Sequence, residues 1–306
     1  MLYGKKKYEE DFNYIMKRYE DNLSDKSWIE HLLNAVKNNN IKNKSYSTLG
    51  VISWDANVFF VNATKSYLID KDIESYKRNM YVGSKLSIMG EDSRNFLVYD
   101  RRTMFRILAS NNQDLIHFIK KYPELLTYRI KNKFLKQDIQ SYLTKTVLLA
   151  FLGKWEEVLD RCNTYFQNKP ASGYYNLASV EFDFLNALAE KNVEQMKKNI
   201  DKMLDKKIAR KLVYNMDRKF EFWLQMYAVM YLKIALYHGY DFEIDCDICP
   251  KDLIDNTPAK EYPEPFEFMN KFDLKTITPE KWKEWIYEYC KNKEELLEDE
   301  KAGYFI

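Results

Sequence analysis

Glycine and proline are scarce in this chain, with 8 and 7 residues among 306. Proteins built from many β-strands need turn residues about every ten positions. The shortage therefore argues against a β-sandwich or barrel and favours long helices joined by short polar connections. Glycine-rich phosphate loops, G-x-S-x-G elbows and H-E-x-x-H pairs are also absent from the sequence, which weighs against nucleotide-dependent enzymes.

Cysteines and long apolar runs are scarce as well. Four cysteines in a chain of this length do not form a disulfide framework, which favours a reducing cytoplasm. The first residues contain no apolar run of signal-peptide length. The most apolar stretch, Trp223 to Tyr237, is interrupted by Gln225 and Lys233 and is shorter than the ~20 residues that span a bilayer. We therefore expect a cytoplasmic protein that does not enter the membrane.

An excess of charge of one sign is missing too. The 48 Lys and Arg residues balance 46 Asp and Glu, leaving a net charge of +2, which gives no global attraction to nucleic acid or membranes. Apolar residues make up 46% of the chain and aromatic residues 16%, too many for a disordered protein. We interpret the 24 Tyr and 18 Phe mainly as core residues. An aromatic-rich recognition surface is the alternative.

Apolar residues recur at helical spacing through the first 120 residues. A capping box at Ser27 and Glu30 starts the second helix. The third could instead be a strand, since N-V-F-F-V-N-A-T has strand propensity. Gly83 is expected to weaken the fourth helix, and a boundary is expected between Gly90 and Asp100. Helices are predicted from Tyr8 to Tyr19, from Ser27, from Ser47 to Tyr67, from Asp72 to Ile88, from Arg101 to Ala109, and after Asn112 and Pro123.

The middle of the chain predicts two successive helical hairpins. Residues 142–167 read as helix, tight break and helix, and residues 175–205 repeat the plan. Aligning Ala150 with Ala187 gives a period of 37 residues, within the ~34 to 47 of helical-hairpin repeats. A third long helix from Phe220 to Tyr237 also ends in a break, at His238 and Gly239.

The chain changes character after this third helix. The segment D-F-E-I-D-C-D-I-C alternates like an extended strand or an ordered loop. A proline-containing loop follows, and Thr278 with Pro279 then starts a last helix before an acidic tail. We therefore predict an all-α fold of stacked antiparallel helical hairpins, with a short extended segment near residues 241–249. Three regions, 1–95, 96–257 and 258–306, are expected to form one continuous globular unit.

Two stretches resemble a known family. They are the hairpin break from Ala187 to Val193 and the run from Ala235 to Ile254, in which H-G-Y-D leads through an acidic segment to C-P-K-D-L-I. This combination resembles the all-α immunity proteins of bacterial polymorphic-toxin systems, in particular the immunity protein forty-nine family. The resemblance implies a cytoplasmic protein that is not an enzyme and that binds a cognate secreted toxin, blocking its active site or substrate entry. It implies no cofactor and assigns no partner-binding residue.

A C-x-x-C pair, Cys246 and Cys249, is a candidate metal or redox motif. With His238 and Cys290 it could form a zinc site, but the spacing is unusual and coincidence is the favoured interpretation. A thioredoxin-type role needs a βαβ context that the sequence lacks. We therefore assign no metal ligand.

Carboxylates and histidines offer candidates for acid–base chemistry. Glu181 and Asp183 could do acid–base work, hold magnesium, or meet basic residues of a toxin. A solvated helix face is the favoured interpretation, as it is for the acidic first turns from residue 156 to 160 (Glu156, Glu157 and Asp160). The three histidines, His31, His117 and His238, are interpreted as packed or solvated.

Lysine-rich stretches are the main support for nucleic-acid binding. Ten Lys or Arg residues lie between Lys191 and Lys219, diluted by four acids. A second group of Lys and Arg residues could bind phosphates while Tyr122 and Tyr128 stack on bases. The neighbouring acids favour an ordinary charged helix surface instead. This second group consists of Lys120, Lys121, Arg129, Lys131, Lys133 and Lys136.

Four functions remain in order of preference. The first is an immunity protein that neutralises a toxin by direct binding. The second is a helical-repeat adaptor for another protein, with the same fold and a different partner. An RNA- or DNA-binding protein and an enzyme built around Glu181 and Asp183 follow.

Overall fold

The computed structural model describes residues 5–38, 47–90, 101–123, 134, 139–168, 178–213 and 223–289. Over these residues the chain is helical and contains no β-strand, which confirms the predicted all-α fold. Two compact units result, and each combines separate parts of the chain. The first unit consists of residues 1–12, 97–109 and 130–257, and the second of residues 13–96, 110–129 and 258–306. The three regions expected from the sequence stay a prediction.

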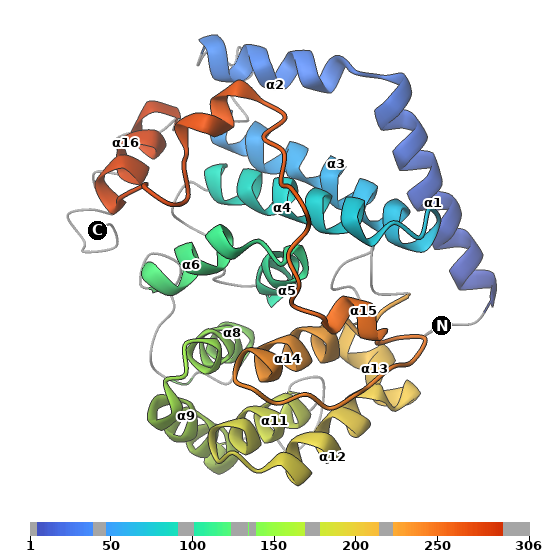
Figure 1. Cartoon of the computed structure of the whole chain (residues 1–306), viewed down its shortest axis with the longest axis vertical. Helices are drawn as coiled ribbons and strands as arrows, with labels where there is room; N and C mark the ends of the chain where they lie inside the picture. The colour runs from blue at the N-terminus through green and yellow to red at the C-terminus, as the bar shows by residue number, and fades with distance from the viewer. Residues whose placement is uncertain are drawn as a thin grey trace. The chain divides into compact units, whose positions relative to one another are not determined.

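The second unit is built around a hairpin of two long helices, α3 and α4 (Figure 1). Helices α2 and α16 pack against α3. The strand alternative for α3 is wrong, because its residues form a helix whose N-cap, Ser47, accepts a hydrogen bond from the Gly50 N–H at 3.0 Å. The helices are α2 (Ser27–Asn38), α3 (Thr48–Leu68), α4 (Ile73–Met89), α6 (Gln113–Lys121), the 3₁₀ helix η2 (Glu267–Lys271) and α16 (Pro279–Tyr289).

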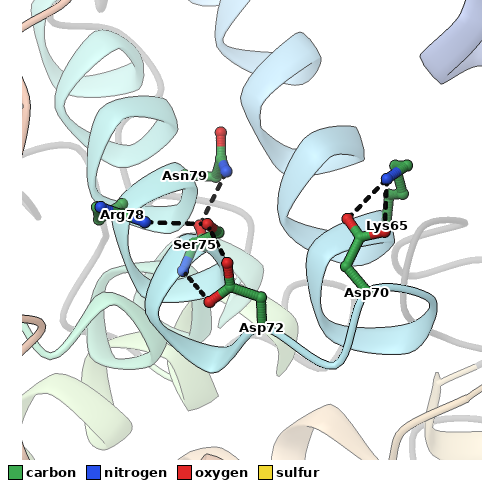
Figure 2. Close-up of polar contacts among 6 residues, drawn as sticks. All are labelled: Lys65, Asp70, Asp72, Ser75, Arg78 and Asn79. Atoms are coloured by element: carbon green, nitrogen blue, oxygen red, sulfur yellow. Dashed lines mark hydrogen bonds and ion pairs between the residues drawn. The ribbon is translucent and has the colours of Figure 1, made fainter.

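Side-chain hydrogen bonds fix the turn between α3 and α4 (Figure 2). Asp72 caps α4: its carboxylate accepts the Ser75 N–H at 2.9 Å and the Ser75 hydroxyl at 2.6 Å. These two bonds lower the pKa of Asp72. Lys65, in the last turn of α3, pairs with Asp70 at 2.6 Å. A polar turn thus ends one helix and starts the next, as expected from the sequence.

Two details of the helix starts and interiors correct the sequence interpretation. Ser27 is already inside α2, and its N–H donates to the side chain of Asp25 at 2.9 Å, so Asp25 provides the cap. Helix α4 runs through Gly83 without a break. A Cβ atom at Gly83 would lie 2.7 Å from the ring of Phe60, so the glycine lets α3 and α4 approach closely.

The first unit contains the predicted hairpins, α8 with α9 and α11 with α12. Helix α11 packs against α9, α12 and α8, and α14 contacts α8, α12 and α13 (Figure 1). Helix α1 (Lys5–Ser24) begins in this unit and continues into the second. The other helices are α5 (Arg101–Ser110), α8 (Ile139–Phe151), α9 (Trp155–Asn168), α11 (Ser179–Ala189), α12 (Val193–Leu204), α13 (Lys206–Val213), α14 (Met226–Tyr237) and α15 (Lys251–Ile254).

Three helices of this unit, α8, α11 and α14, end in the same hydrogen-bonded turn. A residue in the left-handed region donates its N–H to the carbonyl three residues earlier, and the next residue donates to the carbonyl five residues earlier. The left-handed residues are Gly153, Lys191 and Gly239, with φ of 72°, 58° and 87°. Gly153 and Lys191 lie 38 positions apart, so the 37-residue alignment is out of register by one.

The C-terminal part follows the sequence closely. Residues 241–245 form a loop in which Glu243 takes a left-handed φ of 50°, and Cys246 and Cys249 form an isolated bridge. Of the two alternatives for this segment, the ordered loop is therefore present and the extended strand is wrong. Thr278 caps α16 by accepting the Lys281 N–H at 3.3 Å. None of the helices within the described ranges combines the length and low polarity that crossing a bilayer requires. The predicted boundary at residues 91–100, the helix beyond Pro123 and the acidic tail lie outside those ranges.

Candidate functional site

Glu181 lies at the centre of a buried charge cluster that also contains Arg101, Gln140, Tyr227 and Tyr231. Glu181, in the first turn of α11, is 1% exposed and forms an ion pair with Arg101, which is 2% exposed. The Tyr231 hydroxyl on α14 donates to the same carboxylate at 2.8 Å. Arg101 also donates to the Gln140 side-chain oxygen at 2.8 Å, and its guanidinium carbon lies 4.1 Å from the centre of the Tyr227 ring. The buried charge cluster therefore ties α5, α8, α11 and α14 together.

The interpretation of Glu181 as part of a solvated face is wrong. Its carboxylate faces a guanidinium and a phenol, and burial raises the pKa of Tyr231, which keeps that phenol protonated. A carboxylate stabilised in this way is a poor general base. Asp183, its suggested partner in acid–base work, is half-buried on the same helix.

The candidate zinc ligands have other roles where they are described. His238 places Nε2 2.9 Å from the Ala150 carbonyl oxygen, and its ring packs edge-on against Trp155. Cys246 is exposed, whereas Cys249 is buried, which raises the pKa of its thiol. Within the described ranges no three His, Cys, Asp or Glu residues form a group that could hold a metal ion. Cys290 lies outside them.

The remaining acid–base candidates are exposed. His31 and His117 lie on the surfaces of α2 and α6. The carboxylates of α9, Glu156, Glu157 and Asp160, are exposed too, in agreement with the solvated face predicted for them. Three carboxylates near a helix N-terminus are favourable there without any catalytic role.

Helices α12 and α13 and the turn before them carry eight exposed basic residues, which we call the basic strip. Three exposed acids, Glu194, Asp201 and Asp205, interrupt it, and Asp205 accepts the N–H groups of Lys207 and Ile208 at the start of α13. This mixture matches the predicted charged helix surface. Of the second basic group only Lys120 and Lys121 lie within the described ranges. The basic strip consists of Lys191, Lys197, Lys198, Lys202, Lys206, Lys207, Arg210 and Lys211, all exposed.

An acidic segment, residues 240–255, follows α14. Its carboxylates are exposed, and Lys251 is the single Lys or Arg within it. Asp241 accepts the Glu243 N–H at 3.0 Å, and Glu243 takes a left-handed φ of 50°. Asp245 accepts the Lys251 N–H at 3.1 Å and so fixes the start of α15. The exposed carboxylates are those of Asp241, Glu243, Asp245, Asp247, Asp252 and Asp255.

Hydrogen bonds from two buried residues, Gln225 and Lys233, hold this acidic segment against α14. The backbone N–H of Gln225, which precedes α14, donates to the Ile248 carbonyl at 2.7 Å. Lys233 is 0% exposed, and its ammonium donates to the carbonyls of Leu253, Ile254 and Asp255 at 3.3, 3.4 and 2.7 Å. Because a buried ammonium needs such acceptors, Lys233 fixes the C-terminal end of α15.

A cavity of about 110 Å³ lies between the end of α14, the acidic segment and α15. Leu236, Ile244 and Ile254 contribute apolar walls, and Asp241 and Glu243 line it as well. Sequence reasoning described this segment as extended but gave it no role. In the D-F-E-I run, Phe242 and Ile244 are half-buried and Asp241 and Glu243 are exposed, but all four residues line the cavity, so the alternation does not indicate it.

Comparison with known proteins bears on the same region. Residues 154–253, from the break before α9 to α15, match the family described as Immunity protein 49. No curated protein and no solved structure matched the chain. The matched residues contain Glu181, the basic strip, α14 and nearly all of the acidic segment. Over them this chain is similar to the immunity protein 49 family, which confirms the resemblance predicted from the sequence.

Proposed function

We propose that this protein is an immunity protein that neutralises a cognate bacterial toxin by binding it directly, in the cytoplasm of the cell that makes both. The observation that carries the proposal is the match of residues 154–253 to the Immunity protein 49 family. The proposed action is binding rather than catalysis, with the toxin's active site or substrate entrance covered in the complex.

The use of charged residues in the first unit supports this proposal. Buried titratable side chains serve the fold: Glu181 pairs with Arg101, Lys233 binds backbone carbonyls, and Arg161 donates to the Tyr142 carbonyl at 2.8 Å. Other charged side chains lie on the surface in two groups of opposite sign, the basic strip and the acidic segment. Rigid helices with charged, solvated surfaces suit protein recognition, in which a few anchors supply affinity and charges steer the encounter.

Co-expression with a toxin tests the proposal. The toxin domain encoded beside this gene is expressed from an inducible promoter in a bacterial host, with this protein or with an unrelated helical protein of similar size. We expect growth to be restored only by this protein, and a complex of the two chains to co-purify. Continued killing without any complex would refute the proposal.

The adaptor alternative needs a different experiment. Its fold would be the same, so only the identity of the partner distinguishes it. Tagged protein purified from its native host, followed by mass spectrometry, is expected to recover a toxin domain. Recovery of a stable multi-subunit complex without a toxin would favour the adaptor.

A further inference from the structure

The cavity beside the acidic segment has the chemistry of a socket for one basic side chain. We propose that it receives a lysine or arginine side chain of the toxin and so forms the anchor point of the complex. This inference rests on the proposed function and adds the place and chemistry of the contact. The volume of the cavity, about 110 Å³, is well below the roughly 300–1,000 Å³ of pockets that hold small molecules or cofactors.

The lining of the cavity fits the two parts of a basic side chain. Leu236, Ile244 and Ile254 contribute apolar surface to the lining, and the exposed residues Asp241 and Glu243 contribute carboxylates to the same lining. Lysine and arginine bury an apolar stem and keep the charged end near water or a carboxylate. An acidic side chain of a partner would be repelled by the lining carboxylates, and a purely apolar one would not offset their charge, since three carboxylates line the cavity against the one cation Lys251.

The charge around the cavity favours the same occupant. Six exposed carboxylates lie between residues 241 and 255, against the one cation Lys251, which also lines the cavity. The backbone N–H of Lys251 is bound to Asp245, and its side chain is exposed. Asp255, a further lining residue, accepts the Thr257 hydroxyl at 2.8 Å. A net negative surface of this kind attracts a basic patch and raises the rate of association.

The walls are held in place before any partner arrives. Lys233 binds three carbonyls at the end of α15, and the Gln225 to Ile248 hydrogen bond fixes the acidic segment to the start of α14. The turn at Gly239, with its φ of 87°, sets the direction in which the segment leaves α14. A preformed socket loses little conformational freedom on binding, which is typical of interface anchor sites.

A probe that does not depend on the toxin tests the socket alone. Methyl-labelled protein is titrated with N-acetyl-arginine methylamide and, separately, with its neutral isostere N-acetyl-citrulline methylamide. We expect the methyl signals of Ile244 and Ile254 to shift with the arginine compound at a Kd of roughly 1–10 mM. The citrulline compound is expected to bind at least about fivefold more weakly, because it lacks the charge. Equal binding of the two compounds, or no shift at either isoleucine, would overturn the proposal.

Charge-matched variants test the socket in the complex. D241N/E243Q removes two carboxylates that line the cavity, and D247N/D252N removes two exposed carboxylates of the same segment that do not. We expect the first pair to weaken toxin binding at least about tenfold and the second less than about threefold. Equal losses would contradict the socket while leaving the proposed function intact. If the unaltered protein does not bind the toxin, the proposed function fails, and the arginine titration still decides whether the socket binds a basic side chain.

Discussion

Glu181 and Glu243 belong to the same unit but to regions with opposite use of charge. Glu181 is buried and paired with Arg101 and Tyr231, whereas Glu243 is exposed beside a cavity. Their local sequences are similar, V-E-F-D-F and D-F-E-I-D, with acids alternating with apolar residues. Local pattern therefore does not determine which carboxylate is buried. The difference arises from Arg101, 80 positions from Glu181, which supplies a buried cation.

The comparison separates charges that hold the fold from charges that remain available to a partner. Removing a buried partner leaves an uncompensated charge inside the protein, whereas removing a solvated one costs little. Substituting a buried acidic residue that pairs with a cation should therefore lower stability. Substituting an exposed acidic residue should leave stability unchanged and can weaken toxin binding.

Breaking the buried charge cluster is expected to have the largest effect. Glu181→Ala leaves Arg101 without its carboxylate and should lower the free energy of unfolding by about 3–5 kcal/mol, measured by urea denaturation. Glu243→Ala is the matched control and should change it by less than about 0.5 kcal/mol, because Glu243 is exposed. Similar losses for the two variants would show that the comparison is wrong.

Asp55 extends the comparison because it is buried and forms no ion pair with any cation among the described residues. It is 5% exposed on α3, its Oδ2 has no hydrogen-bond partner among the described residues, and burial raises its pKa to about 7. Between pH 4 and pH 7 the folded protein retains a proton that the unfolded chain has lost, so this residue makes stability fall as pH rises through that window. The loss is complete about one unit above the folded pKa, near pH 8.

Replacing Asp55 with asparagine removes this titration. Asp55→Asn should be more stable than the unaltered protein by about 2–4 kcal/mol at pH 8, with the difference shrinking toward zero near pH 4. Urea denaturation at pH 4, 5.5 and 8 provides the measurement. A difference that does not vary with pH would mean that Asp55 is not protonated in the folded state.

Lys233 connects the buried charges to the acidic segment. Lys233→Met keeps the apolar stem but removes the ammonium that binds the three carbonyls at the end of α15, and should cost about 1–3 kcal/mol. We also expect the substitution to speed hydrogen exchange in α15 more than in α8, because Lys233 binds carbonyls at the end of α15 and none in α8. Unchanged exchange in α15 would show that other contacts hold this wall of the cavity.

The smallest effect on stability is expected when the two exposed carboxylates that line the cavity, Asp241 and Glu243, are neutralised. D241N/E243Q should change the free energy of unfolding by no more than about 0.5 kcal/mol in urea denaturation, since both carboxylates are exposed. A loss of 2 kcal/mol or more would assign these residues to the fold and remove the stability contrast with Glu181.

Features that depend on neighbouring residues were predictable from the sequence. Caps at Ser47, Asp72, Asn112 and Thr278 begin helices where the sequence places them, because a capping side chain acts within three residues of its own position. The breaks at Gly153 and Gly239 follow from glycine at a left-handed position.

Features that depend on distant residues were not predictable. Gly83 is explained by the ring of Phe60 on another helix, and Glu181 by Arg101 on another. The repeat register was shifted by one because Lys191, without the glycine that usually marks this position, takes the left-handed conformation. The cavity depends on α14, the acidic segment and α15 together, so the alternation in the sequence alone could not reveal it.

Hydrogen–deuterium exchange of this protein with and without the toxin domain tests the central claim most directly. We predict that bound toxin slows amide exchange in residues 236–255 and leaves exchange at the basic strip on α12 and α13 unchanged. Protection confined to the basic strip would contradict the proposed contact site. No protection anywhere at saturating toxin would contradict direct neutralisation by binding.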